Sequence, residues 1–194
     1  METRELLAKA FDDAARVLGD FTRDAHTTAR IEQLVKHVAA ACRAGRKVMI
    51  CGNGGSLCDA AHFAEELTGR FRKDRGPLAA IACADAGHIT CVANDYGFEE
   101  VFARWVRALG QTGDVLIVLS TSGNSENCVR ACIAGRELGL NTCAMLGRGG
   151  GRMKGLCDLE IVVPGETSDR IQELHMLILH AVVEGVEALL ADKK

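Results

Sequence analysis

KVMICGNGGSLCDAAHFAEELTG, residues 47–69, is the stretch that decides the fold of this chain. It opens with an apolar run, turns at a glycine-rich corner over 51–56 and ends in an alanine-rich amphipathic segment. That order is typical of a strand, a phosphate-sized loop and a helix. The glycines let backbone N–H groups come close to a ligand, and the positive end of the helix points at the same place. The stretch therefore predicts an anion-binding loop.

The chain beyond this stretch repeats the alternation of apolar runs and helical patterns. The apolar runs lie at 47–51, 79–83, 115–120, 141–146 and 159–163, and the helical patterns at 57–69, 98–109, 125–138 and 152–156. Near-continuous apolar runs suit parallel strands that are covered on both faces. The sequence therefore predicts an α/β fold, a doubly wound five-stranded parallel sheet of the flavodoxin-like kind. Its ligand crevice is expected at the carboxyl ends of the strands.

Helical segments flank this core on both sides. Residues 1–45 carry two amphipathic patterns, a helical pair that either packs on one face of the sheet or dimerises, and we expect both. Residues 169–191 form one predicted helix that is apolar nearly all round, which indicates burial on more than one side and hence a subunit interface. We expect a single domain over 1–194, made of the helical extension 1–45, the α/β core 46–165 and the C-terminal helix 166–194.

The composition argues against several classes of function. The net charge is -3 with no basic run, so we expect no nucleic acid partner. No apolar stretch reaches about 18 residues and the N-terminus lacks the layout of a signal peptide, so we expect no membrane association and a cytoplasmic location. The nine cysteines include no C-x-x-C pair. We expect most of them to be small buried hydrophobic residues of a reducing compartment rather than zinc ligands.

A second loop, STSGNS at residues 120–125, follows the third predicted strand. Its hydroxyl groups and the N–H groups of the next helix can wrap a phosphate without a lysine, although a hydroxyl-rich turn with a helix cap has the same composition. Its place after a buried strand favours a ligand loop. Neither loop has the G-K-[ST] or G-x-G-x-x-G spacing of nucleotide sites, so a phosphorylated small molecule fits better. A third glycine-rich segment, 147–151, is interpreted as a flexible rim.

Two polar pairs are candidates for the chemistry. His62 and Glu66 lie four residues apart on the helix after the first loop and share a face. They are either a solvated surface pair or an acid/base or metal pair that faces the crevice. Asn94 and Asp95 follow the second strand and either bind sugar hydroxyls or form a turn or helix N-cap.

The last helix carries three further candidates. Asp169-Arg170-Ile171-Gln172 matches a D-x-x-Q capping box, which is the structural interpretation of Gln172. His180 sits inside an apolar stretch, where a satisfied core histidine is the ordinary alternative to a functional one. His175 has the same ambiguity.

Four motifs together resemble a known family. CGNGGS, CDAAHFAEELTGR, VLSTSGNSENCV and SDRIQELHMLILH are similar to the bacterial phosphoheptose isomerases, single-domain members of the sugar isomerase (SIS) family, over nearly the whole chain. The resemblance implies interconversion of sedoheptulose 7-phosphate and D-glycero-D-manno-heptose 7-phosphate, the first step of ADP-heptose biosynthesis for cell-surface polysaccharides such as lipopolysaccharide. It also implies a cytoplasmic homotetramer with active sites between subunits.

The resemblance assigns roles to individual residues. It implies that Glu66 and His180 are the catalytic pair and that one zinc ion per active site is held by His62, Glu66, Gln172 and His180. The implied substrate contacts are Asn53, Gly54, Gly55, Glu66, Asn94, Asp95, Ser120, Thr121, Ser122, Ser125 and Gln172, with Ser56 and Arg70 as additions near the phosphate.

Helix geometry constrains this zinc site. Gln172 and His180 are eight residues apart, so they lie about 12 Å apart along one helix. Two ligands of one zinc ion lie only about 3–3.5 Å apart, given metal–ligand bonds near 2 Å. We therefore expect at least one site to borrow a last-helix residue from a neighbouring subunit.

Two rival interpretations remain. One is a non-catalytic SIS-domain binding protein of the replication-initiator-associating type, which lacks the equivalents of Glu66 and His180. The other is an isomerase of the same family that acts on another sugar phosphate. Because the chain keeps both Glu66 and His180, we favour an enzyme.

Overall fold

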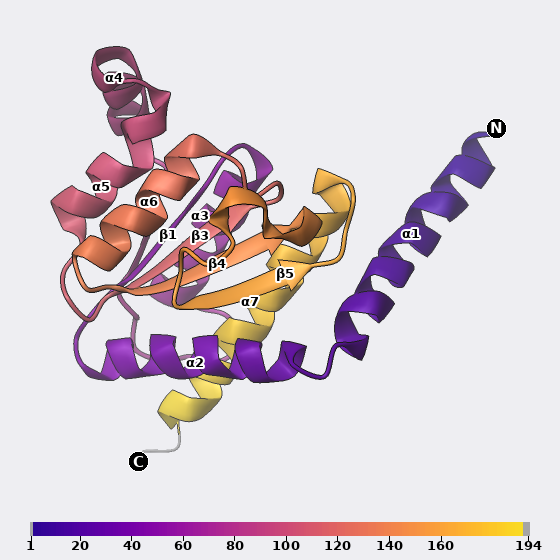
Figure 1. Ribbon diagram of the computed structural model, residues 1–194. Coiled ribbons are helices and arrows are strands. Elements are labelled where there is room, and N and C mark those ends of the chain that lie inside the picture. The colour runs from indigo at the N-terminus through magenta and orange to yellow at the C-terminus, as the bar shows by residue number, and fades with distance from the viewer. Residues whose placement is uncertain (1, 192–194) are drawn as a thin grey trace.

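The predicted sheet is present in a computed structural model that describes residues 2–191 (Figure 1). Its five strands lie in the order β2-β1-β3-β4-β5, and every neighbouring pair is parallel. The strands are β1 (Val48–Gly52), β2 (Ala80–Ala82), β3 (Val115–Ser120), β4 (Asn141–Gly147) and β5 (Leu159–Val163). The predicted fold class is thus confirmed, including the order typical of flavodoxin-like sheets.

Helices cover both faces of this sheet. They are α1 (Thr3–Arg23), α2 (Thr27–Arg43), α3 (Gly55–Thr68), α4 (Ala86–Tyr96), α5 (Val101–Leu109), α6 (Glu126–Glu137) and α7 (Ser168–Ala191). Two short 3-10 helices, η1 (Phe98–Glu100) and η2 (Arg148–Met153), complete the list. The predicted N-terminal pair and the long C-terminal helix are both present.

Strand periodicity divides the core into two layers. Val48 and Ile50 of β1 pack with α2, α3 and α7, whereas Met49 and Cys51 point to the other face and pack with α5 and α6. Strands buried on both faces explain why the apolar runs are continuous rather than alternating. Five of the nine cysteines, Cys51, Cys83, Cys128, Cys132 and Cys143, are buried in these layers, as expected.

The structure differs from the predicted elements in three places. Helix α4 was not anticipated, and it contains Asn94 and Asp95, which therefore occupy neither a loop nor an N-cap; Asp85 caps this helix by accepting a hydrogen bond from the N–H of His88. The predicted helix 98–109 is divided into η1 and α5. The predicted helix 152–156 is wrong, because its first two residues end the 3-10 helix η2 and a turn follows.

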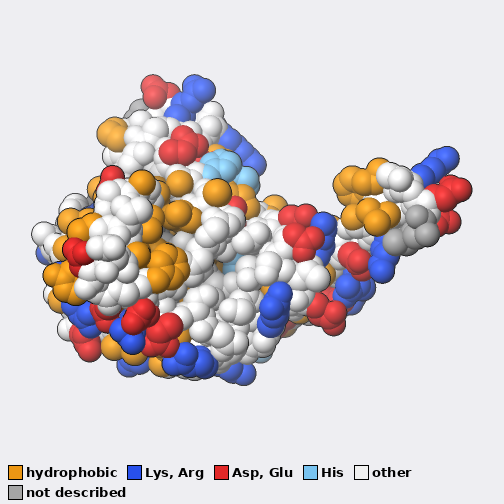
Figure 2. Space-filling view, turned by 90° about the horizontal axis from the view of Figure 1, so that it is seen from above, with side chains coloured by type: hydrophobic (Ala, Val, Ile, Leu, Met, Phe, Trp, Pro, Cys, Tyr) orange, Lys and Arg blue, Asp and Glu red, His pale blue; other side chains and the backbone are white. Residues whose placement is uncertain are grey.

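Helix α1 projects from the body of the molecule, as Figure 1 shows. It buries only Val17 and Phe21. Hydrophobic side chains gather along the projecting arm in Figure 2, and they include Leu6, Leu7 and Phe11, which is 75% exposed. Of the predicted helical pair, α2 packs on the sheet, while Leu6, Leu7, Phe11 and Leu18 of α1 are exposed.

Helix α7 lies in the core. By length and composition alone it is, among residues 2–191, the one helix that could cross a membrane, with 39% of its apolar window buried. Core helices pass the same test, and α7 packs against α2 and α3 with a buried stripe between Ile171 and Val186. Packing within the chain therefore accounts for part of its hydropathy, and the predicted subunit interface on its remaining apolar surface stays a prediction.

Candidate active site

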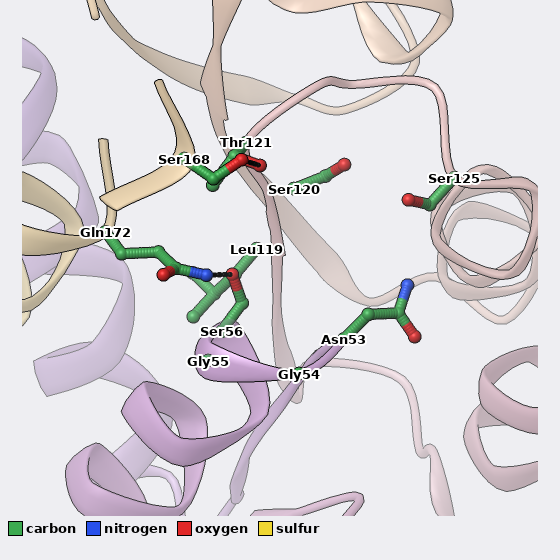
Figure 3. A pocket seen from close by; sticks show the side chains of 10 residues that line it. All are labelled: Asn53, Gly54, Gly55, Ser56, Leu119, Ser120, Thr121, Ser125, Ser168 and Gln172. Carbon is green, nitrogen blue, oxygen red and sulfur yellow. Dashed lines mark hydrogen bonds between the residues drawn. The ribbon is translucent and has the colours of Figure 1, made fainter. Parts of the chain in front are cut away.

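A cavity of about 300 Å³ opens at the carboxyl end of the sheet, between β1 and β3 (Figure 3). The chain leaves β1 toward β2 on one side and β3 lies on the other, so this is the topological switch point where α/β sheets bind ligands. The cavity is lined by Asn53, Gly54, Gly55, Ser56, Leu119, Ser120, Thr121, Ser125, Ser168 and Gln172. We call this cavity the anion pocket, because helix N-termini face it.

Three helix N-termini converge on this pocket. Helix α3 begins at Gly55, α6 begins directly after its N-cap residue Ser125, and α7 begins at Ser168, and all three residues line the cavity. Each helix N-terminus carries a partial positive charge and unsatisfied N–H groups. The lining residues include no lysine or arginine. Helix ends and hydroxyls, rather than side-chain cations, therefore supply the attraction for an anion.

Gln172 closes one side of the pocket. Its Nε2 donates a hydrogen bond to Ser56 Oγ at 3.3 Å, and a Cβ added at Gly55 would lie 2.7 Å from the Gln172 side-chain oxygen. Only glycine at position 55 leaves room for this amide. The capping-box interpretation of Gln172 is wrong, because α7 already begins at Ser168 and the Gln172 amide is bonded to Ser56.

A buried amide orients the first loop. The side chains of Asn53 and Asn127 exchange two hydrogen bonds of 2.9 Å, and Asn127 is 3% exposed. Asn127 Oδ1 also accepts a hydrogen bond from the N–H of Cys128. Sequence reasoning missed this residue, since only the packing of α6 beside the end of β1 brings it to Asn53.

The second loop is held by the third glycine-rich segment. Ser120 Oγ accepts a hydrogen bond from the N–H of Gly123, and the N–H of Met153 donates to the Gly123 carbonyl. A Cβ at Gly123, where φ is +63°, would lie 1.9 Å from the Gly150 carbonyl oxygen. Residues 147–151 therefore pack against the loop that carries Ser120 without lining the pocket, and their interpretation as a flexible rim stays a prediction. Ser122 accepts from the Asn124 N–H and does not line the pocket.

The second feature is a cluster of three titratable side chains on α3 and α7, His62, Glu66 and His180, which we call the acid/base cluster. Glu66 Oε1 lies 3.3 Å from His62 Nε2 and 3.4 Å from His180 Nε2. Glu66 is buried, and the burial raises the pKa of its carboxyl group, although the two imidazoles oppose the shift. The Phe71 ring stacks on His180 at a centroid distance of 5.9 Å.

The acid/base cluster fits a metal ion. Ligand atoms of its three residues lie within 4.8 Å of one another, and Glu66 Oε2 is buried without a hydrogen-bond partner. Two imidazoles and a carboxylate are a donor set that zinc accepts. Gln172 of the same chain is not in this group, since its amide lies at the anion pocket about 12 Å along the helix.

Besides Ser122, three predicted contact residues lie outside both features. Arg70 follows the end of α3 and is exposed. Asn94 and Asp95 are exposed near the end of α4, where the Asn94 amide donates to Asp95 Oδ1 at 2.7 Å. Within one chain, none of the three lines the anion pocket. His175, in contrast, is a core residue whose ring nitrogen Nε2 lies 3.3 Å from the Leu146 carbonyl oxygen.

Comparison with known proteins agrees with this architecture. The model of the SIS domain family matches residues 11–147. The chain is 49% identical to a phosphoheptose isomerase of Fusobacterium nucleatum over 184 residues, 95% of each chain, and 48% identical to one of Vibrio parahaemolyticus, covering 95% of this chain and 97% of that one.

Solved structures agree as well. A phosphoheptose isomerase from Francisella tularensis superimposes with a TM-score of 0.91 at 34% identity, covering 96% of this chain and 98% of that one. One from Neisseria gonorrhoeae gives 0.89 at 36% identity, covering 96% and 100%. The chain therefore belongs to the SIS domain family and, within it, to the phosphoheptose isomerases.

Proposed function

We propose that this protein is an aldose–ketose isomerase that interconverts sedoheptulose 7-phosphate and D-glycero-D-manno-heptose 7-phosphate, the entry step to ADP-heptose. The observation that carries the proposal is the pairing of the buried Glu66 carboxylate with His180 Nε2, 3.4 Å away, on the same two helices that begin at an anion pocket. A binding protein has no need of a buried carboxylate that faces two imidazoles.

The chemistry requires two proton transfers. Isomerisation moves hydrogen between the first two carbons of the sugar through a cis-enediol or enediolate. We assign removal of the carbon-bound proton to Glu66 and exchange of the oxygen-bound proton to His180. Burial raises the pKa of the Glu66 carboxyl group and strengthens it as a base, whereas zinc bound to the same carboxylate would weaken it, so we propose that the metal organises the site rather than sharing every step. The anion pocket holds the phosphate and so fixes the register of the carbon chain.

We propose zinc as the metal of the acid/base cluster, held by His62, Glu66 and His180. When bound, zinc would polarise the sugar carbonyl as a Lewis acid. The fourth protein ligand in the proposal is Gln172 from a neighbouring subunit, because Gln172 of the same chain is engaged with Ser56.

Substrate length supports an active site shared between subunits. An extended chain advances about 1.2 Å per bond, so the seven bonds from the second carbon of a heptulose 7-phosphate to phosphorus span roughly 8 Å. The anion pocket and His180 are separated by about 12 Å along α7. A substrate anchored in one pocket falls short of the acid/base cluster of the same chain. We therefore propose a homotetramer in which each site combines parts of two chains, with Arg70, Asn94 and Asp95 completing the substrate contacts.

The test is direct conversion. The protein is incubated with sedoheptulose 7-phosphate and heptose phosphate is followed by NMR, with parallel samples of Glu66→Gln and of wild-type protein treated with a chelator. We expect turnover by the wild type alone. A folded, zinc-loaded wild type that converts nothing would favour the binding-protein alternative.

A mixing experiment tests the shared site. Ser125→Asp places a negative charge in the anion pocket while keeping a good N-cap for α6, and Glu66→Gln removes the base. If each site combines two chains, co-expression of the two variants restores part of the activity at substrate concentrations where each alone is nearly inactive. No recovery in verified mixed assemblies would mean that both parts act within one chain.

The remaining parts of the proposal concern the cell. We propose a cytoplasmic enzyme without nucleic acid or membrane partners, in line with the net charge of -3 and the packed position of α7. The single-domain organisation over 1–194 stays a prediction.

A further inference from the structure

The lining of the anion pocket supplies less positive charge than would balance a bound sugar phosphate. A sugar phosphate carries close to two negative charges near pH 7, and the lining residues include no lysine or arginine. Helix N-termini supply only about half a charge each. A fixed cation within reach of the pocket would therefore strengthen binding. Such a cation, the Arg148 guanidinium, is hydrogen-bonded to the lining residue Ser168.

Ser168 is a lining residue that the sequence motifs did not single out. It begins α7, is partly buried, and its Oγ lies 3.1 Å from Thr121 Oγ1 on the same side of the pocket (Figure 3). Arg148 does not line the pocket, but its Nη2 donates a hydrogen bond to Ser168 Oγ at 3.3 Å. The guanidinium is held at a second point, because its Nε donates to the Glu166 carbonyl at 2.8 Å. The exposed Arg148 is the one non-glycine residue among 2–191 with positive φ, at 49°.

The chemistry of the guanidinium and hydroxyl groups determines which of them donates a hydrogen bond. A guanidinium donates hydrogen bonds and cannot accept them, so Ser168 Oγ is the acceptor toward Arg148. Donation from a cation polarises the Ser168 hydroxyl and makes its own proton a better donor. Thr121 Oγ1, 3.1 Å away, can accept that proton. A phosphate oxygen in the pocket is a stronger acceptor than the neutral Thr121 hydroxyl, so the proton can turn to the ligand.

We propose that Ser168 is a further phosphate-binding residue and that Arg148 is the positioning residue that polarises it, bringing positive charge to the pocket through one hydroxyl. The inference rests on the proposed function only in taking a sugar phosphate as the ligand. It assigns Arg148 a role in affinity for the phosphate group and none in the proton transfers at Glu66 and His180.

The test uses inorganic phosphate as the probe, titrated calorimetrically into the intact assembly of wild type, Ser168→Ala, Arg148→Gln and the double variant. We expect each single variant to raise the Kd about tenfold, as for the loss of one hydrogen bond to a charged group. Because Arg148 acts through Ser168, we expect the double variant to be no weaker than Ser168→Ala. Ser168→Thr, which keeps the hydroxyl, should restore binding.

Kinetics and a matched control complete the experiment. We expect KM for the sugar phosphate to rise in parallel with the Kd for phosphate, with kcat changed by less than about twofold, since the contact is equal in ground and transition states. Arg152→Gln is the control, because Arg152 is exposed in the same segment but its guanidinium pairs with Glu126. It should bind phosphate like the wild type.

The outcomes separate the two proposals. Undiminished phosphate binding by Ser168→Ala or Arg148→Gln, effects that multiply in the double variant, or a wild type that does not bind phosphate would each overturn the inference. A wild type that binds phosphate but does not isomerise, with both variants weakened, would overturn the proposed function and leave this assignment standing.

Discussion

The anion pocket and the acid/base cluster are built on the same two helices, yet by opposite means. The pocket lies where α3 and α7 begin and is lined by glycine, hydroxyl and amide groups without a lysine or arginine. The cluster lies two or three turns further along, where side chains of the two helices meet around a buried carboxylate. The pocket uses backbone dipoles to hold charge, whereas the cluster uses burial to change the basicity of a side chain.

This difference separates binding from chemistry. Changes in the pocket should act on KM, because its contacts to the phosphate are the same in the ground state and the transition state. Changes in the cluster should act on kcat. Variants of Glu66, Ser125 and Asn127 can break or sharpen this division, and a variant of His175 tests a titration on α7 that lies outside it.

The largest effect is expected from Glu66→Gln, which keeps the shape of the side chain but removes its basicity. We expect kcat to fall about a thousandfold with KM changed little, in the range of general acid–base catalysis. Steady-state kinetics on zinc-matched samples measures it. A fall in kcat of less than tenfold would remove Glu66 from the role of base.

The pocket counterpart is Ser125→Asp, with Ser125→Asn as the neutral N-cap control. Two like charges about 4 Å apart near a protein surface repel by about 4 kcal/mol, so we expect KM to rise several hundredfold in the Asp variant. The Asn variant should stay within a few-fold of the wild type. An Asp variant with normal KM would place the phosphate elsewhere.

His175 of α7 is expected to make the free energy of unfolding depend on pH, independently of catalysis. Burial lowers its pKa to about 4 from an ordinary 6.5, so the folded protein keeps the ring neutral where the unfolded chain takes up a proton. The free energy of unfolding should therefore fall by about 3 kcal/mol as the pH drops from about 6.5 to 4, and should be unaffected by this group above that range. Denaturant unfolding at several pH values measures the change.

The matched variant is His175→Gln, which can still donate to the Leu146 carbonyl but does not titrate. Its loss of stability on acidification should be smaller than that of the wild type by the amount due to His175. Equal acid sensitivity of the two proteins would show that the ring is protonated in the fold.

The smallest effect is expected from Asn127→Ala. The variant removes both hydrogen bonds to Asn53, so we expect a loss of about 1–3 kcal/mol in the free energy of unfolding, since the Asn53 amide loses its buried partner. KM should rise a few-fold, and kcat should stay unchanged. A large fall in kcat would instead couple the first loop to the acid/base cluster.

Much of the fold was predictable because strands buried on both faces leave continuous apolar runs. Helix α4 was not, since only Val92 of its residues is buried and its pattern is weak. The segment 147–151 was interpreted as a flexible rim and 152–156 as a helix, because the packing of Gly150 and Gly151 on the second loop is a contact between segments that are distant in sequence.

The candidate site divides in the same way. Both loops of the anion pocket are contiguous motifs, so the residues that line it, from Asn53 to Ser125, stand out in the sequence. Asn127 and Ser168 lie within quoted motifs that did not single them out, and Arg148 lies outside those motifs. Their roles depend on hydrogen bonds to Asn53, Thr121 and Ser168 that form only when separate elements meet.

By itself, the sequence determined the strand–loop–helix units, the two anion loops and the residue types needed for proton transfer, because local periodicity and glycine placement dictate local structure. Only the tertiary structure decided that α3 and α7 begin at one pocket, that Glu66 is buried between two imidazoles, and that Gln172 lies with the pocket instead of with His180. The reason is physical: burial, helix convergence and the separation of positions along a packed helix belong to the assembled fold and not to any one segment of it.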